Sequence, residues 1–366
     1  MHSSDKNSAA PETTPDIQPS DKSRLSAAVD CILQQASHGQ AAIPPDLTRP
    51  AFESSQTNRT PQPLGIPWLD SMLAGGLADG EVFLFLGPSG GGKTTISTQI
   101  AWLRAMQRSH TVYITYDEPL EGYIDNRFCS LMTGTPRPDF EKQAIADMAP
   151  DIQHRFQAWR EAYGGFLHLY DGSSAVHGKG GVEDVRRTIA DEIDQGRRPG
   201  LVIVDWVQCA VLKGPGRGVG SAREVAEKMD DYARQFAAIC RDQRIQGILV
   251  QQLAAPYQRA WNIDIDHKMA EACSTLGKHC QHAVGIGRLT PEGEGLMISS
   301  KGVIPSASRS PQPVRLNGAL NRFEVPAETS HNEQIEQLVA GYRAPFQKKA
   351  NHNTADHGGQ QLIHRV

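Results

Sequence analysis

Between about residues 62 and 326, short apolar runs alternate with longer stretches in which apolar residues recur every three or four positions. The short runs are rich in β-branched and aromatic residues and predict strands at 82–86, 111–115, 166–170, 201–204, 246–250, 283–289 and 295–300. The longer stretches predict helices at 95–107, 120–133, 141–163, 182–195 and 222–243. Because apolar strands that alternate with helices are typical of buried parallel sheets, we predict an α/β fold with a mostly parallel central sheet and helices on both faces.

The two ends of the chain lack this alternation. Nine of the 23 prolines fall within residues 1–67, among Ser, Thr, Gln and Asn. Such a composition buries too little apolar surface to offset the entropy of ordering the chain, so we predict a mostly disordered extension over 1–61. Apolar residues at helical spacing in 23–36 fit either a short docking helix or a transient helix in a tail. The predicted core is then 62–326, followed by a helix and a flexible tail over 327–366.

Composition narrows the class of protein. The chain has 366 residues and a net charge of −4, so any contact with nucleic acid depends on local basic patches. Its six cysteines include no CxxC pair, which is typical of reduced thiols in a cytosol. The N-terminal segment lacks the apolar centre of a secretion signal, and no run approaches the roughly 18 apolar residues that span a membrane. We therefore expect a cytoplasmic protein that does not associate with membranes.

One glycine-rich segment carries a specific chemical signal. The pattern Gly87-x4-Gly92-Lys93-Thr94 lies between a predicted strand and a predicted helix, which is the setting of a phosphate-binding loop. Glycines allow backbone N–H groups to surround phosphate oxygens, and the helix N-terminus adds partial positive charge. We predict that Lys93 reaches the β- and γ-phosphates and that Thr94 binds Mg²⁺. The candidate nucleotide-binding residues are Gly87, Pro88, Ser89, Gly90, Gly91, Gly92, Lys93, Thr94 and Thr95.

Two strand ends supply carboxylates. The run "LVIVDWVQ" places Asp205 at the end of a strand, where it either holds Mg²⁺ through water or caps a turn. The next residue is Trp206, so the glutamate that many nucleotide hydrolases carry there as general base is missing. Parallel sheets gather ligand groups at the carboxyl ends of their strands, and the strand at 111–115 is followed by Asp117 and Glu118. From these residues alone, a water-activating carboxylate and an acidic start to the next helix are equal alternatives.

The order of several motifs resembles a known family. "LGIPWLDSMLAGGLADGEVFLFLGPSGGGKTT", "LVIVDWVQ", "GILVQQLAA", "STLGKHCQHAVGIGR" and "PVRLNGALNRFEV" follow one another as in the RecA-type ATPase core of DnaB-like replicative helicases and KaiC/RadA-like ATPases. The similarity spans residues 64–326. It implies a RecA-like P-loop NTPase fold, ATP and Mg²⁺ as cofactors, and nucleotide sites between the subunits of a homo-oligomer, either a hexameric ring or a filament.

The resemblance also assigns roles to individual residues. In the family, the strand after the phosphate-loop helix ends in the catalytic glutamate, which matches Glu118. The DnaB-like pattern has an arginine nine residues later, and Arg127 stands at that spacing. The terminal glutamine of "GILVQQ" matches the residue that senses the γ-phosphate, which is Gln252 here.

The sequence departs from the family at one late strand. DnaB-like cores end this strand with Lys-x-Arg, which reaches the nucleotide of the neighbouring subunit. Lys301 stands at the lysine's position, but Val303 stands at the arginine's position. Because a trans-acting arginine accelerates phosphoryl transfer by orders of magnitude, either Arg309 or another basic residue replaces it, or hydrolysis is slow.

Two segments are candidates for contact with DNA. The segment "KGPGRGVGS" (213–221) combines four glycines with Lys213 and Arg217, which suits sequence-independent contact with phosphates or, alternatively, a solvated surface loop. The segment 255–268 offers Arg259 as a second phosphate contact.

The sequence leads to two hypotheses about the function. One is a DnaB-like DNA helicase or DNA-handling ATPase of replication, recombination or repair, with single-stranded DNA as partner. The other is a KaiC-like regulatory ATPase that acts through protein partners without unwinding DNA.

Overall fold

A computed structural model describes residues 60–172, 181–212, 221–258, 265–302 and 311–326. Within these ranges the strands form a nine-stranded sheet in the order β3-β2-β4-β5-β1-β6-β7-β8-β9. The strands are β1 (Val82–Gly87), β2 (Thr111–Thr115), β3 (Leu167–Asp171), β4 (Leu201–Asp205), β5 (Gln246–Gln252), β6 (His282–Ile286), β7 (Glu294–Lys301), β8 (Gln312–Asn317) and β9 (Arg322–Glu324). The extension, helix and tail that the sequence predicts at the two ends lie outside the described residues.

The direction of the strands divides the sheet into two parts. Strands β1 to β6 run parallel to one another, whereas β7 pairs antiparallel with β6, β8 with β7 and β9 with β8. This arrangement confirms the predicted α/β fold with a mostly parallel sheet. Every residue of β1, β2 and β4 is buried, as expected for parallel strands covered on both faces. Because the six parallel strands run in one direction, their carboxyl ends lie along one edge of the sheet.

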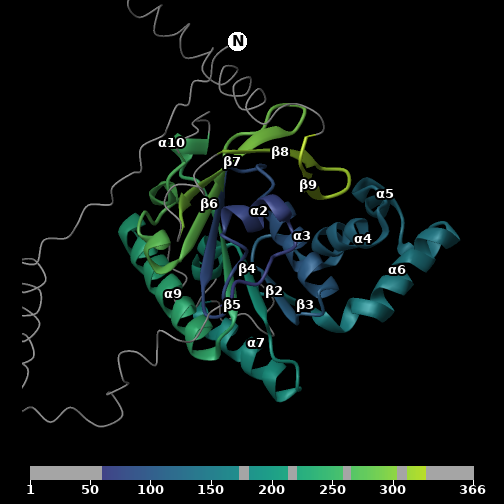
Figure 1. Ribbon diagram of the computed structural model, residues 1–366, viewed down its shortest axis with the longest axis horizontal. Helices are drawn as coiled ribbons and strands as arrows, with labels where there is room; N and C mark the ends of the chain where they lie inside the picture. Colours follow the sequence, from purple (N-terminus) through teal and green to yellow (C-terminus); the bar gives the residue numbers. More distant parts are fainter. Residues whose placement is uncertain (1–59, 173–180, 213–220, 259–264, 303–310, 327–366) are drawn as a thin grey trace, which may run out of the picture. The chain divides into compact units, whose positions relative to one another are not determined.

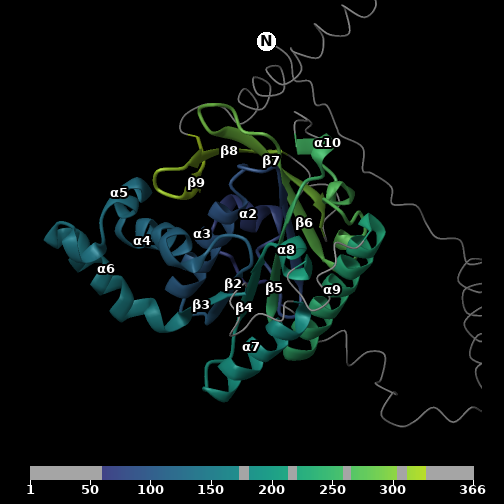
Figure 2. The same cartoon turned by 180° about the vertical axis from the view of Figure 1, so that it is seen from behind.

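Helices cover both faces of the sheet (Figures 1 and 2). The described α-helices are α2 (Pro67–Met72), α3 (Lys93–Met106), α4 (Asp125–Thr133), α5 (Arg137–Lys142), α6 (Pro150–Tyr163), α7 (Val182–Asp194), α8 (Val207–Leu212), α9 (Ala222–Gln243) and α10 (Ala255–Gln258). Alternate residues of β1 point to opposite faces. Val82, Leu84 and Leu86 pack in one core cluster with α7, α8 and α9, and Phe83 and Phe85 pack in another with α2, α3 and α4.

Two predicted helices are wrong in their extent. The predicted helix 141–163 is broken into α5, a short 3-10 turn at Ile145–Asp147, and α6. The helix α5 ends where Gln143 adopts an extended conformation. The helix α6 begins at Pro150, which has no backbone N–H to continue an earlier helix and forces the preceding Ala149 into an extended conformation with ψ 143°. The predicted helix 120–133 becomes regular only at Asp125, because Gly122 adopts a positive φ of 78°.

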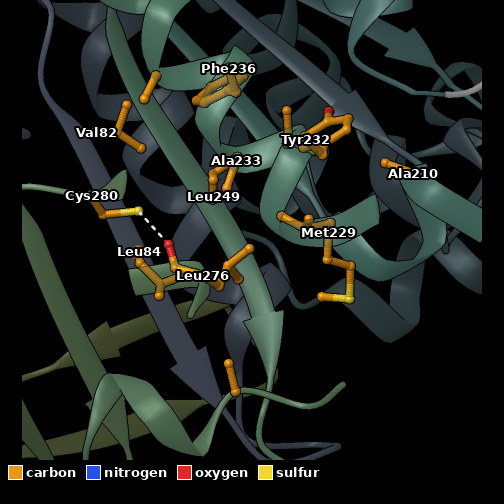
Figure 3. Close-up of a cluster of buried hydrophobic side chains, with 14 of the residues drawn as sticks. Val82, Leu84, Ala210, Met229, Tyr232, Ala233, Phe236, Leu249, Leu276 and Cys280 are labelled. Atoms are coloured by element: carbon orange, nitrogen blue, oxygen red, sulfur yellow. Dashed lines mark hydrogen bonds between the residues drawn. The ribbon is translucent and has the colours of Figure 1, made fainter. Parts of the chain in front are cut away.

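Close contact between α9 and the sheet depends on a glycine. Figure 3 shows Phe236 of α9 and Leu249 of β5 in the same cluster of buried side chains on that face, and Phe236 is fully buried. A Cβ atom on Gly247 of β5 would lie 2.5 Å from Cε1 of Phe236. Glycine at this position therefore allows the aromatic ring to pack directly on the strand backbone.

Replacing Phe236 by alanine should lower the free energy of unfolding by about 3–5 kcal/mol, because the change removes buried apolar surface and leaves a cavity. The matched control is Lys228→Ala, an exposed change on the same helix, which should alter it by less than about 0.5 kcal/mol. Urea denaturation followed by circular dichroism measures both. A Phe236→Ala variant as stable as the wild type would contradict this account of the core.

Candidate nucleotide-binding site

The carboxyl ends of the central strands bring four parts of the sequence together. In the sheet register, Gly87 at the end of β1 lies beside Gln252 at the end of β5. Thr115 at the end of β2 lies beside Asp205 at the end of β4. The chain that leaves β2 then carries Glu118. The residues that the sequence analysis selected from separate strands are thus placed at one edge of the sheet.

The phosphate loop joins β1 to α3 in a conformation that only glycine adopts easily. Gly90 has φ 70° and Gly92, which precedes the first residue of α3, has φ 80°. A Cβ atom on Gly92 would lie 2.6 Å from Cζ of Phe323. The ammonium of Lys93 donates a hydrogen bond to the carbonyl oxygen of Pro88 at 2.9 Å, which holds the side chain across the loop. No capping side chain accepts a hydrogen bond from the N–H groups at the N-terminus of α3, so these groups can donate to an anion.

A cavity of about 380 Å³ lies over this loop. Its lining includes nine of the predicted site residues, namely Ser89, Gly90, Gly92, Lys93, Thr94, Thr95, Glu118, Asp205 and Gln252. Three others support the loop from outside the lining. Gly87 ends β1, Pro88 borders an adjacent hollow, and Gly91 packs so closely that its missing Cβ would lie 2.8 Å from Cδ of Pro88.

Asp205 is a buried carboxylate held by hydroxyl groups. Its Oδ2 accepts hydrogen bonds from the Tyr113 hydroxyl at 2.7 Å and from Ser97 Oγ at 3.1 Å. Burial raises the pKa of Asp205, and hydrogen bonds from Tyr113 and then Thr94 act in the opposite direction. The Thr94 hydroxyl and the Asp205 carboxylate line the same cavity, and both present the oxygen ligands that Mg²⁺ prefers.

A magnesium ion fits this pair only together with other ligands. Among the described residues, no group of three or more His, Cys, Asp or Glu side chains is arranged to hold a metal ion. Mg²⁺ ordinarily keeps several waters and binds through one or two carboxylates plus substrate phosphates. Thr94 and Asp205 would hold it in that manner.

Lys93 lies in strongly acidic surroundings. Burial lowers the pKa of the Lys93 ammonium, because removal of water disfavours its charged form. Four carboxylates oppose this effect, those of Asp205, Asp117, Glu271 and Glu118. Glu271 is a group that the sequence analysis missed. Its backbone N–H donates to the carbonyl oxygen of Gln252 at 2.7 Å, which fixes it beside the end of β5.

Glu118 does not cap the following helix. The helical turn begins two residues later, after Pro119, and no side chain caps it. Both carboxylate oxygens of Glu118 instead accept hydrogen bonds from the Arg127 guanidinium, at 2.9 Å from Nε and 2.9 Å from Nη2. The Thr115 hydroxyl donates to the backbone oxygen of Glu118 at 2.7 Å, so the turn and the side chain are both fixed.

Several cavity residues were not among the predicted site residues. They are Asp117, which was considered only as a neighbour of Glu118, and Arg127, Arg137, Trp206, Leu316 and Gly318. The sequence marked Arg127 only by its spacing from Glu118 and Trp206 only by its position after Asp205, and it did not mark Arg137. Arg137 is placed by its backbone N–H, which donates to the carbonyl oxygen of Ala319 at 2.7 Å. Leu316 and Gly318 come from the hairpin formed by β8 and β9, far along the chain from the phosphate loop.

Other predicted site residues lie elsewhere. The Lys301 ammonium, at the end of β7, donates to the carbonyl oxygen of Gly277 at 2.9 Å and does not line the cavity of its own chain. The candidate trans-acting Arg309 and the candidate DNA contacts Lys213, Arg217 and Arg259 lie outside the described residues. Their roles stay predictions.

Comparisons with known proteins agree with this geometry. A family model described as "ATPase: KaiC" matches residues 62–156. A solved DnaB-like replicative helicase, described with its interactions with primase, matches with a TM-score of 0.59 and 14% identity, over 74% of this chain and 63% of that chain. A second solved structure, described as an ATPase domain, matches with a TM-score of 0.59 and 13% identity, over 86% and 100% of the two chains. A KaiC-like protein from Pyrococcus horikoshii OT3 matches with a TM-score of 0.48 and 15% identity, over 73% and 99%. No curated protein matches the chain.

The fold, the phosphate loop, the family model and the two structures with TM-scores of 0.59 support a RecA-fold P-loop ATPase that resembles DnaB-like helicases and KaiC-like ATPases. The chain spans 63% of the length of the DnaB-like helicase that it matches. At 13% and 14% identity, the structural similarity shows the fold alone. Among the described residues, no helix combines the length and the apolar composition needed to cross a membrane.

Replacing Lys93 by alanine should weaken the binding of ATP with Mg²⁺ by roughly ten- to a hundredfold, the loss expected for hydrogen bonds to a charged group. The matched control is Lys228→Ala, which removes the same charge from an exposed position on α9 outside the cavity and should leave the affinity within about twofold. Titration of a fluorescent ATP analogue measures both affinities. Equal affinities for Lys93→Ala and the wild type would show that the nucleotide binds elsewhere.

Proposed function

We propose that this protein binds ATP together with Mg²⁺ and hydrolyses it. One observation carries the proposal: the phosphate loop, the Thr94–Asp205 pair and the Glu118 carboxylate all face a single cavity. Each of these groups has a different use in phosphoryl transfer, namely phosphate binding, metal binding and activation of water. Their convergence from separate strands supports a hydrolytic site rather than a site that only binds anions.

Residues at the N-terminus of α3 bind the triphosphate. The free N–H groups of the loop and the Lys93 ammonium surround the β- and γ-phosphate oxygens, and their positive charge offsets the charge of the phosphates. Thr94 contributes its hydroxyl and Asp205 its carboxylate to the metal. When bound, Mg²⁺ supplies further positive charge at the phosphates.

Glu118 acts as the general base. A carboxylate has about four acceptor positions, so the two hydrogen bonds from Arg127 leave positions for a water molecule. Glu118 takes a proton from this water while the water oxygen attacks the γ-phosphorus and the bond to the bridging oxygen of ADP breaks. Arg127 keeps the carboxylate in one orientation throughout. Gln252, at the end of β5 in the same cavity, senses the γ-phosphate.

The further use of ATP has two candidates. A DNA-handling ATPase of DnaB-like type, in replication, recombination or repair, is supported by the fold that the chain shares with the DnaB-like replicative helicase. A KaiC-like regulatory ATPase acting through protein partners is supported by the family model over residues 62–156 and by the net charge of −4.

In both cases we propose a homo-oligomer, a hexameric ring or filament, in which Lys301 or Arg309 reaches the neighbouring nucleotide. The five cysteines in the described part of the chain are free thiols, which supports a reducing, cytoplasmic location.

Replacing Glu118 by glutamine should lower the turnover number for ATP at least about a hundredfold, because the general base is lost while the shape of the side chain is kept. The affinity for ATP should stay within about twofold. The matched control is Glu121→Gln, an exposed residue three positions further along the chain, which should keep full turnover. Measurement of phosphate release under saturating ATP decides the question, and an active Glu118→Gln variant would exclude Glu118 as the base.

The same assay with and without single-stranded DNA separates the two candidates. A DNA-handling ATPase should turn over faster with DNA, and reversing the charges of Lys213 and Arg217 should abolish that stimulation, because sequence-independent binding depends on contact with phosphates. Turnover that needs Glu118 but is indifferent to DNA would contradict the first candidate and favour the regulatory ATPase.

A further inference from the structure

The turn between β8 and β9 packs against the helix that begins at the phosphate loop. Asn321, at the end of this turn, is fully buried and has a positive φ of 50°. Its Nδ2 donates to Thr98 Oγ1 at 3.0 Å, and its Oδ1 accepts from Thr95 Oγ1 at 3.2 Å. Both threonines belong to α3. The turn is therefore attached to the phosphate-loop helix through a side chain that comes from more than 200 residues further along the chain.

The same amide oxygen also accepts a hydrogen bond from Arg127. The distance from Arg127 Nη1 to Asn321 Oδ1 is 2.8 Å. Arg127 uses its other two nitrogens on the Glu118 carboxylate, and only 13% of its side chain is exposed. A guanidinium is planar and rigid, so fixing Nη1 on one side fixes the direction of the fork that holds Glu118 on the other. Nη1 of Arg127 also donates to Thr95 Oγ1 at the longer distance of 3.4 Å. Asn321 therefore supplies the shorter of the two hydrogen bonds that orient Arg127, and with it the Glu118 carboxylate, relative to the phosphate loop.

The backbone of the turn does not by itself account for asparagine. Asparagine adopts a positive φ more readily than most residues do. Glycine adopts it more readily still, because it has no Cβ atom. What glycine could not supply is the buried amide that joins Thr95, Thr98 and Arg127. The choice of residue therefore points to the side-chain contacts.

We propose that Asn321 is a positioning residue for ATP hydrolysis and acts on Glu118 through Arg127. This inference rests on the proposed role of Glu118. It makes the β8–β9 hairpin part of the catalytic arrangement, although the hairpin lies far along the chain from the phosphate loop. The catalytic geometry is then completed only when the hairpin is docked on α3.

A neighbouring residue provides a matched control. Gln99 of α3 attaches the same hairpin by two hydrogen bonds: its Oε1 accepts from the Phe323 backbone N–H at 2.8 Å, and its Nε2 donates to the Phe323 carbonyl oxygen at 3.3 Å. Gln99 makes no hydrogen bond to Arg127 among the described residues. Loss of Gln99 weakens docking of the hairpin, whereas loss of the Asn321 amide weakens docking and also leaves Arg127 Nη1 with only its longer, 3.4 Å hydrogen bond to Thr95.

The test compares Asn321→Gly with Gln99→Ala in the full chain. Asn321→Gly keeps the backbone conformation and should lower kcat roughly ten- to a hundredfold, as a small displacement of a catalytic group does, with KM for ATP within about twofold. Gln99→Ala should lower the midpoint of thermal unfolding about as much as Asn321→Gly does, but it should keep kcat within about threefold of the wild type. A third variant, Arg127→Lys, loses the fork and should lower kcat as Asn321→Gly does. The double variant Asn321→Gly/Arg127→Lys should lose no more than either single change, because both act on the same contact.

Each result bears on the inference. Equal losses of kcat in Asn321→Gly and Gln99→Ala would overturn it, since docking alone would then explain the effect. Unchanged kcat in Asn321→Gly, or multiplicative losses in the double variant, would overturn it as well. If the wild-type protein hydrolyses no ATP, or if Glu118→Gln is fully active, the proposed function itself fails, which is distinguishable from a failure of Asn321 in an active enzyme.

Discussion

The buried carboxylate of Asp205 is the constraint on which the rest of the site depends. Removing an ionised carboxylate from water costs several kcal/mol, so it must be surrounded by donors. The Tyr113 hydroxyl from β2 and the Ser97 hydroxyl from α3 supply them, at 2.7 Å and 3.1 Å. Burial and the nearby Asp205 charge raise the pKa of Tyr113 well above its usual value, so this hydroxyl stays a donor. One carboxylate thereby ties β4, β2 and the phosphate-loop helix together in a single geometry.

The sequence predicted those parts of the fold that depend on local pattern. Apolar runs marked the strands of the parallel sheet, and the glycine pattern around Lys93 marked the phosphate loop. The apolar periodicity predicted one helix over 141–163, because it continues on both sides of a break that starts at Gln143 and ends at Pro150. The prediction of parallel strands also placed Asp205 and Gln252 at one edge of the sheet, because the carboxyl ends of parallel strands lie along the same edge.

The remainder of the site depends on contacts between distant segments, which a local pattern does not encode. Arg137 lines the cavity because its backbone is bonded to the turn at Ala319, and nothing in the surrounding residues marks it. Asn321 lies in a stretch that resembled a closing hairpin, yet its contact with Thr95 spans 226 residues. Arg127 was visible only as a spacing of nine residues from Glu118, and that spacing acquires a physical meaning in the bidentate ion pair. Proximity in the fold, rather than in the sequence, selects these residues.

The central claim is that one cavity gathers the groups that bind the triphosphate, the metal and the attacking water. A crystal structure with Mg²⁺ and an ATP analogue that resists hydrolysis tests this claim most directly. The account predicts the triphosphate against Lys93, the metal between Thr94 and Asp205, and the Glu118 carboxylate as the acidic group nearest the γ-phosphate. A nucleotide bound outside this cavity, or a γ-phosphate that faces Asp117 or Glu271 instead of Glu118, would contradict it.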